Sequence, residues 1–165
     1  MGSPVVIALS VVVLALTGAA CGGSTESHHG ISFDANGWTV HDQQPTIGAN
    51  WYMVVTNGDD RSNLVSMVDY AAPAPRNLTA AELREVSPAM IERAARDSDQ
   101  LTTQPMLTKV GTGTGAKIEW DNGSHHVIYY WIGLGDSVLQ ISCQYGDEGS
   151  GRDTCSKIVS SLKKS

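Results

Sequence analysis

The sequence predicts an α+β domain: an antiparallel β-sheet with one long central helix and a C-terminal helix packed on it. Three observations lead to this prediction. Short runs rich in β-branched and aromatic residues recur along the chain, separated by turn signals. Residues 79–97 carry apolar residues at helical spacing, and a shorter helical pattern closes the chain at about 152–163. Runs of strands around one long helix are typical of α+β folds.

The chain begins with an apolar run that predicts export. Residues 5–20 read VVIALSVVVLALTGAA and carry no charge. A helix needs about 20 apolar residues to span a bilayer, so this run is too short to be a transmembrane helix. It fits the apolar segment of a secretory signal, which ends in small residues. Three small residues stand directly before Cys21, an arrangement that resembles the lipobox of bacterial lipoproteins. We therefore predict cleavage before Cys21 and a lipid, such as palmitate, on its thiol.

This prediction divides the chain into three segments and places the domain outside the cytoplasm. Residues 1–20 are the signal peptide, 21–30 a flexible tether, and 31–165 a single α+β domain that is held outside the cytoplasm on the cell membrane. Two features depart from the usual lipobox. Gly18 stands where Leu is usual, and the first 20 residues contain no Lys or Arg, as if the true start codon lay upstream. A plain secretory signal with a free Cys21 and an uncleaved anchor are the alternatives.

The cysteine count agrees with export. Three cysteines are an odd number, which normally indicates one unpaired thiol. If Cys21 carries the lipid, Cys143 and Cys155 remain as a pair, and exported proteins lie where disulfides persist. Their spacing does not match that of metal ligands. We predict a Cys143–Cys155 disulfide that joins the last strand to the last helix.

The strands that precede the long helix are predicted to form two hairpins. Residues 31–40 alternate apolar and polar side chains on either side of Asn36-Gly37, which is a turn signal. Residues 51–57 and 64–72 have strong β character and are joined by a polar loop, and prolines end the second of them.

The long helix has a recognisable start and one apolar face. Thr79 and Glu82 have the spacing of a capping box, in which each side chain bonds a backbone N–H at the helix start. Pro88 interrupts the amide ladder, but the apolar stripe keeps its phase across the proline. This favours one kinked helix over two short ones. The stripe consists of Leu83, Val86, Met90, Ile91 and Ala94.

Strands return after the helix. The glycine-rich stretch 111–116 predicts a mobile hairpin loop. Residues 116–121 and 125–132 flank an Asp-Asn-Gly-Ser turn and predict a hairpin, and residues 137–145 follow as the next strand. The closing helix places its apolar residues on one side: Cys155, Ile158, Val159 and Leu162.

With this order of elements, ISFDANGWTV (31–40) and the closing SCQYGDEGSGRDTCSKIVSSLKK resemble the LpqN/LpqT-type lipoproteins of mycobacteria and related actinobacteria. The resemblance covers about 31–163 and rests on the early hairpin with Trp38, the central helix, and the terminal strand, cysteine and helix. It implies a PsbP-like α/β/α sandwich in a cell-envelope lipoprotein, without catalytic machinery, that works as a binding or assembly accessory. It transfers no functional residue and names no ligand.

Charge and motifs argue against several function classes. The net charge of −6 and the lack of a basic stripe argue against nucleic-acid binding. Successive residues of a strand face opposite sides, so His125 and His126 do not chelate one ion easily, and no spacing such as HExxH occurs. The stretch 111–116 lacks the lysine of a phosphate-binding loop, and no G-x-S-x-G motif is present. We predict no enzyme activity, no metal site and no cofactor.

The aromatic residues supply the candidate binding site. The chain has one Phe but four Trp and five Tyr. Tyr129 with Trp131, or Trp38 with Trp51, could line a groove for an apolar or glycan ligand. We expect a noncatalytic binding or accessory domain whose partners are the membrane and an envelope lipid or a membrane transporter. One alternative is a structural or protein-interaction module whose aromatic residues are all core. The other is a hydrolase or metalloprotein too divergent to recognise.

Overall fold

The computed structural model describes residues 25–57, 60–97, 100–101, 103–146 and 149–164. In chain order their elements are β1 (Thr25–His28), β2 (Ile31–Asp34), β3 (Thr39–Gln43), β4 (Ala49–Asn57), β5 (Asp60–Tyr70), α1 (Ala80–Asp97), β6 (Gln100–Leu101), β7 (Met106–Val110), β8 (Gly113–Asp121), β9 (His126–Gly133), β10 (Val138–Tyr145), α2 (Ser150–Ser161) and β11 (Lys163–Lys164).

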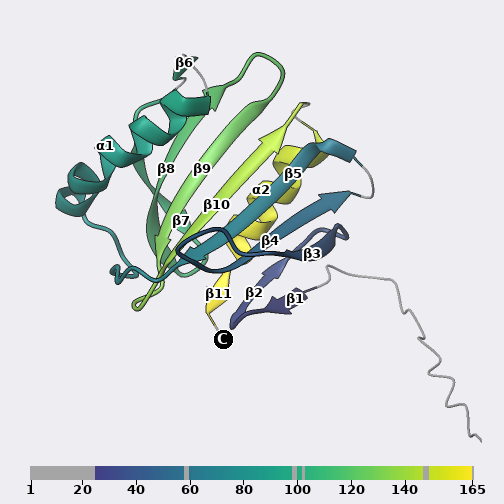
Figure 1. Cartoon of the computed structure of the whole chain (residues 1–165), viewed down its shortest axis with the longest axis horizontal. Coiled ribbons are helices and arrows are strands. Elements are labelled where there is room, and N and C mark those ends of the chain that lie inside the picture. Colours follow the sequence, from purple (N-terminus) through teal and green to yellow (C-terminus); the bar gives the residue numbers. More distant parts are fainter. Residues whose placement is uncertain (1–24, 58–59, 98–99, 102, 147–148, 165) are drawn as a thin grey trace, which may run out of the picture.

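A large antiparallel sheet forms the centre of the molecule. Its strands run in the order β3-β4-β5-β10-β9-β8-β6, and β7 also pairs with β8. β5 and β10 are neighbours although α1 and four strands lie between them in the sequence. A smaller sheet, in the order β1-β2-β11, brings the start of the described chain next to its end (Figure 1).

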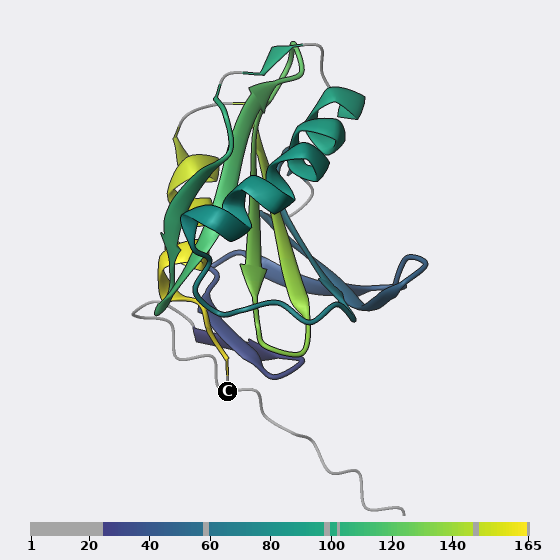
Figure 2. The same cartoon turned by 90° about the vertical axis from the view of Figure 1, so that its left-hand side faces the viewer.

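The two helices lie on opposite faces of the large sheet, as Figure 2 shows. On one face α1 contacts β8, and the core between them contains Met90, Ala94, Ile118, Trp120 and Tyr129. On the other face α2 contacts β10, β5 and β2, and a larger core contains Phe33, Met53, Met67, Ile141 and Ile158. The predicted α+β class, with both helices packed on an antiparallel sheet, is confirmed.

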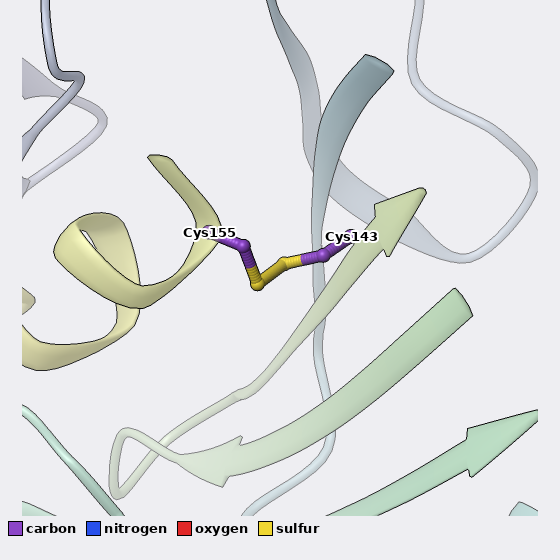
Figure 3. Close-up of a disulfide and its surroundings, with 2 residues drawn as sticks. All are labelled: Cys143 and Cys155. Carbon is purple, nitrogen blue, oxygen red and sulfur yellow. A yellow bond between two sulfur atoms is a disulfide. The ribbon is translucent and has the colours of Figure 1, made fainter. Parts of the chain in front are cut away.

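A disulfide fixes α2 to the sheet. Cys143 on β10 and Cys155 on α2 are bonded, with their Cα atoms 5.8 Å apart (Figure 3). Both residues are buried among the apolar side chains on the α2 side. The last helix is therefore held to the central strand pair β5–β10 covalently as well as by packing.

Helix α1 begins where the capping box predicts. The Thr79 backbone N–H donates to Glu82 Oε2 at 2.7 Å, and the Glu82 N–H donates to Thr79 Oγ1 at 3.3 Å. The helix runs through Pro88 as one element. The Ser87 hydroxyl, just before the proline, donates to the Leu83 carbonyl at 2.6 Å.

The predicted hairpin over residues 31–40 is wrong. β2 pairs with β1 and β11, whereas β3 pairs with β4. The turn itself does form: Asn36 and Gly37 have φ values of 55° and 80°, and the Trp38 N–H donates to the Ala35 carbonyl at 2.9 Å. The turn carries the chain from the small sheet to the large one, so the flanking strands pair with different partners.

Part of the range predicted as a flexible tether, 21–30, is ordered as strand β1. Its four residues, TESH, lack the apolar alternation that marks a strand in a sequence. They pair with β2 in register from Thr25 opposite Asp34 to His28 opposite Ile31. Pairing with a partner strand, rather than a pattern of its own, makes this segment a strand.

The stretch 111–116 is also not a mobile loop. Its residues from Gly113 onwards belong to β8 and pair with β7, and Ala116 also pairs with Trp131 on β9. The glycines allow backbone to approach closely, because a Cβ on Gly111 would lie 1.8 Å from the Leu162 carbonyl oxygen and one on Gly113 2.7 Å from that of Arg76. These glycines therefore permit packing rather than mobility.

Candidate functional site

The side of the large sheet that faces α1 is only partly covered. α1 packs on β8 and on the strands β6 and β7 beside it. In Figure 1, no helix lies over β10, β5 and β4 on this side, and α2 lies behind the sheet. The side chains that point to the α1 side from these three strands are half-buried at most positions. A groove lined by residues of α1, β4, β5, β9 and β10 lies on this side of the sheet.

The strand register places the side chains of this face in three rows that cross the sheet. One row is Tyr129, Ser142, Ser66, Val54 and His41. The second is Trp131, Gln140, Val68, Tyr52 and Gln43, and the third is Val127, Gln144, Leu64, Thr56 and Thr39. In each row a hydroxyl or amide side chain of β10 lies between β9 and β5. Gln140 and Gln144 have apolar or aromatic neighbours on both sides, and Ser142 lies between Tyr129 and Ser66.

Tyr129 joins the sheet to the helix that walls the groove. Its hydroxyl accepts a hydrogen bond from Arg93 Nε on α1 at 3.1 Å and another from Gln140 Nε2 on β10 at 2.9 Å. The Arg93 guanidinium carbon lies 5.7 Å from the centre of the Tyr129 ring, within the range of a cation–π contact. These contacts fix the helix against the sheet at the edge of the open face.

The groove is lined mainly by polar side chains. It has a volume of about 410 Å³. Its lining, as far as the structure describes it, contains hydroxyls, amides and one guanidinium but no carboxylate, imidazole or thiol to act as a general base or nucleophile. The residues are Tyr52, Leu64, Ser66, Arg93, Asn122, Val127, Tyr129, Ser142 and Gln144.

The four aromatic residues predicted to bind a ligand do not share one site. Tyr129 and Trp131 point to the α1 side, as their parity predicts, and Tyr129 lines the groove. Trp131 is half-buried against the α1-side core. Trp38 and Trp51 lie in the core on the α2 side, where they are 7 % and 9 % exposed. Cys21, the predicted lipid site, lies outside the described residues.

Sequence reasoning missed Arg93 and the polar residues of β10. A signal for the latter was present, because polar and apolar residues alternate strictly along Gln140–Tyr145, which is typical of a strand with one exposed face. The position of Arg93 was not predictable in this way. It lines the groove only because α1 crosses the sheet over β8 and leaves β10 uncovered.

A second polar group lies on the α2 side, at the β8–β9 edge. His126 lies between two carboxylates: its Nδ1 is 2.7 Å from Asp121 Oδ1 and its Nε2 is 3.3 Å from Glu119 Oε2. Lys117 Nζ also contacts Glu119, at 2.5 Å. Burial alone would raise the pKa of Glu119, but Lys117 and His126 outweigh it and hold this pKa below its usual range. Within the described part of the chain, no three His, Cys, Asp or Glu residues are arranged to hold a metal ion.

Tyr130, near this group, gives a testable pH dependence. Burial, followed by the charges of Glu119 and Tyr145, raises the pKa of Tyr130 to about 12. This pKa is higher in the folded chain than in the unfolded one. The contribution of Tyr130 to the free energy of unfolding is therefore fully present below about pH 10 and is lost as the pH rises to about 12. The free energy of unfolding should therefore fall by about 2–3 kcal/mol across this interval. Urea unfolding at several pH values should show a shallower fall in Tyr130→Phe, and an identical fall would contradict the assignment.

Comparison with known proteins bears on the fold. No protein-family model matches the sequence, and no curated protein does. The solution structure of cyanobacterial PsbP (CyanoP) from Synechocystis sp. PCC 6803 matches with a TM-score of 0.57 and 15 % sequence identity, over 89 % of this chain and 98 % of that one.

The fold is PsbP-like. A crystal structure from Bacteroides thetaiotaomicron matches with a TM-score of 0.50 and 13 % identity over 82 % of this chain. The matched part is 45 % of that protein, so this chain spans less than half of its length. In this PsbP-like domain neither helix of the described residues is long and apolar enough to cross a membrane.

Proposed function

We propose that this protein is a noncatalytic binding lipoprotein of the cell envelope that holds the hydroxyl-rich headgroup of an envelope glycolipid in the groove between α1 and the open sheet face. The observation that carries the proposal is the composition of that face. Its positions on β10 are Gln140, Ser142 and Gln144. Tyr129 is the neighbour of Ser142 on β9, and Tyr52 on β4 lies in the row of Gln140. Amides and hydroxyls both donate and accept hydrogen bonds, and tyrosine rings offer apolar area with a polar end. This combination suits sugar rings.

The character of the groove selects among the ligands expected from the sequence. An acyl chain is best held in a concave pocket lined mainly by apolar side chains. The groove beside α1 is open, and most of its lining residues are polar. A headgroup therefore fits it better than an acyl chain does. The cation of Arg93 at the wall would also tolerate a phosphate on that headgroup.

The anchor and the family remain parts of this proposal. Cleavage before Cys21 and a lipid on its thiol would display the domain on the outer face of the cytoplasmic membrane, where such headgroups lie. Membership of the LpqN/LpqT-type lipoproteins agrees with the PsbP-like fold, and it would make the protein an accessory of envelope lipid handling or of a membrane transporter. Labelling with a palmitate analogue, compared between the wild type and Cys21→Ala, tests the anchor. Equal labelling of the two would contradict lipidation of Cys21.

The groove is tested by filling it. Ser142 is half-buried between Ser66 and Tyr129, so Ser142→Phe should place a ring in the groove and weaken ligand binding at least tenfold. Ser160→Phe, at an exposed position on α2 at the opposite face, is the matched control and should bind normally. The measurement is calorimetric titration with vesicles of the cell's own polar lipid extract and with the water-soluble headgroups released from it.

The outcomes separate the possible occupants. Saturable binding of the released headgroups supports the proposal, and binding of intact vesicles alone would show that the acyl chain is needed. No saturable binding, together with a co-purifying protein, would favour the interaction module instead. The feature that favours that alternative is Ile47, which is fully exposed in the β3–β4 connection. A partner lost in Ile47→Asp would identify this connection as its contact.

A further inference from the structure

A second pocket lies at the opposite end of the strands from the groove, on the other side of the sheet. It is formed where β4, β5 and the β9–β10 turn meet β11 and the β1–β2 turn. Asn50, Trp51, Asp69 and Ser137 line it, and Asp136 and Lys164 stand at its rim. Its volume is about 220 Å³, which is small even for a metabolite site.

The buried carboxylate of Asp69 is the unusual feature of this pocket. Asp69 is 4 % exposed, and it lies in register between Trp51 on β4 and Leu139 on β10, both of them core residues. Its Oδ2 accepts a hydrogen bond from Asn50 Nδ2 at 2.8 Å. Its Oδ1 has no hydrogen-bond partner among the described residues. A buried polar atom left in this way is destabilising, so its retention calls for an explanation.

No cation of the described chain neutralises Asp69. Lys164, which lines the pocket, donates to Asp136 Oδ1 at 2.7 Å and to the Leu134 carbonyl at 2.9 Å. The ion pair of Lys164 with Asp136 leaves the charge of Asp69 to be met by something else. Because Asn50 supplies only a neutral amide hydrogen bond, the pocket as a whole favours a positive ligand.

An aromatic wall stands beside this charge. Trp51 lines the pocket, and the His29 ring stacks on it with the ring centres 5.0 Å apart and the planes 9° from parallel. His29 Nε2 is itself 2.8 Å from Asp42 Oδ1, which holds the imidazole in place. A carboxylate next to an indole is a combination that suits ammonium groups, because the carboxylate offers a charge-assisted hydrogen bond and the indole offers apolar area to the attached carbon atoms.

We propose that this pocket binds a primary ammonium group, with the Asp69 carboxylate as its counterion and Trp51 contacting its carbon stem. A quaternary ammonium has no N–H to donate to a carboxylate. A neutral sugar would leave the buried charge without a counterion. The source of the ammonium is either an aminoethyl lipid headgroup or a free amine such as an amino sugar. This site is separate from the groove beside α1, so either can fail without the other.

The test compares amines with neutral molecules of the same shape, using the full chain. NMR or calorimetric titration should show saturable binding of ethanolamine and of glucosamine, with dissociation constants on the order of 1 mM as befits so few contact atoms. Ethylene glycol and glucose should bind at least tenfold more weakly. Equal binding of ethanolamine and ethylene glycol, or no binding of either amine, would overturn the proposal.

Variants locate the site. Asp69→Asn should weaken amine binding at least tenfold, whereas Asp153→Asn, which makes the same charge change at an exposed position on α2, should not. Undiminished binding in Asp69→Asn would overturn the assignment. If that variant fails to fold, the comparison of ethanolamine with ethylene glycol in the wild type decides alone. Co-sedimentation with phosphatidylethanolamine vesicles, against phosphatidylglycerol vesicles, then distinguishes a lipid headgroup from a soluble amine.

Discussion

Replacing Trp120 by alanine is expected to lower the free energy of unfolding by about 3–5 kcal/mol. The Trp120 side chain is fully buried and packs with Tyr129, with the ring centres 5.1 Å apart, in the core that joins α1 to β8 and β9. Its removal would leave a cavity that the rigid sheet cannot close. Since a domain of this size is stable by about 5–15 kcal/mol in total, the change should be measurable directly by urea unfolding.

Trp120→Phe separates the loss of packing from the loss of the buried indole N–H at the same position. The Trp120 Nε1 atom has no hydrogen-bond partner among the described residues. Trp120→Phe removes this buried N–H together with some packing area, so part of the lost packing energy is offset. Its cost should be well under that of Trp120→Ala. A loss below about 1 kcal/mol in Trp120→Ala itself would show that α1 does not depend on this core.

Removing the disulfide is expected to have the second-largest effect. Replacing both Cys143 and Cys155 by alanine releases a cross-link between residues separated by 12 positions. The chain-entropy model assigns about 3 kcal/mol to a loop of this size. For a domain of this length the loss corresponds to a fall in melting temperature of roughly 10 °C.

Thermal unfolding followed by circular dichroism checks this expectation. Cys21→Ser is the matched control, because it removes a cysteine without touching the pair. A reducing agent should reproduce the effect of the double variant on the wild type and change the double variant itself little. Equal melting temperatures for the wild type and the double variant would contradict the stabilising role of the bond.

Local patterns along the chain predicted most of the elements. The capping box of Thr79 and Glu82 forms the predicted bonds, and the apolar stripe of α1 packs on the sheet. The parity of the β9 strand also holds: Tyr129 faces α1, whereas Tyr130 belongs to the core on the α2 side. These features depend on the period of a helix or a strand, which a short segment carries by itself.

Features that depend on distant segments were not predictable in the same way. The pairing of β5 with β10, the assignment of β2 to a separate sheet and the existence of β1 all depend on partners far away in the sequence or on a polar strand with no pattern of its own. The groove depends on where α1 crosses the sheet. The ammonium pocket depends on Asp69, which in the sequence is an ordinary polar residue before a turn and becomes unusual only through its burial.

Strand β1 has a consequence for the reach of the domain. It begins at Thr25, so a lipid on Cys21 would be joined to the folded domain by only four peptide steps, at most about 14 Å of extended chain. A flexible tether of ten residues would span up to about 35 Å. With so short a linker, the domain would lie against the headgroups of the leaflet that holds the lipid, with the small sheet next to the bilayer. With a lipid on Cys21, the proposed binding sites would therefore meet ligands of the anchoring leaflet and would not reach across the envelope.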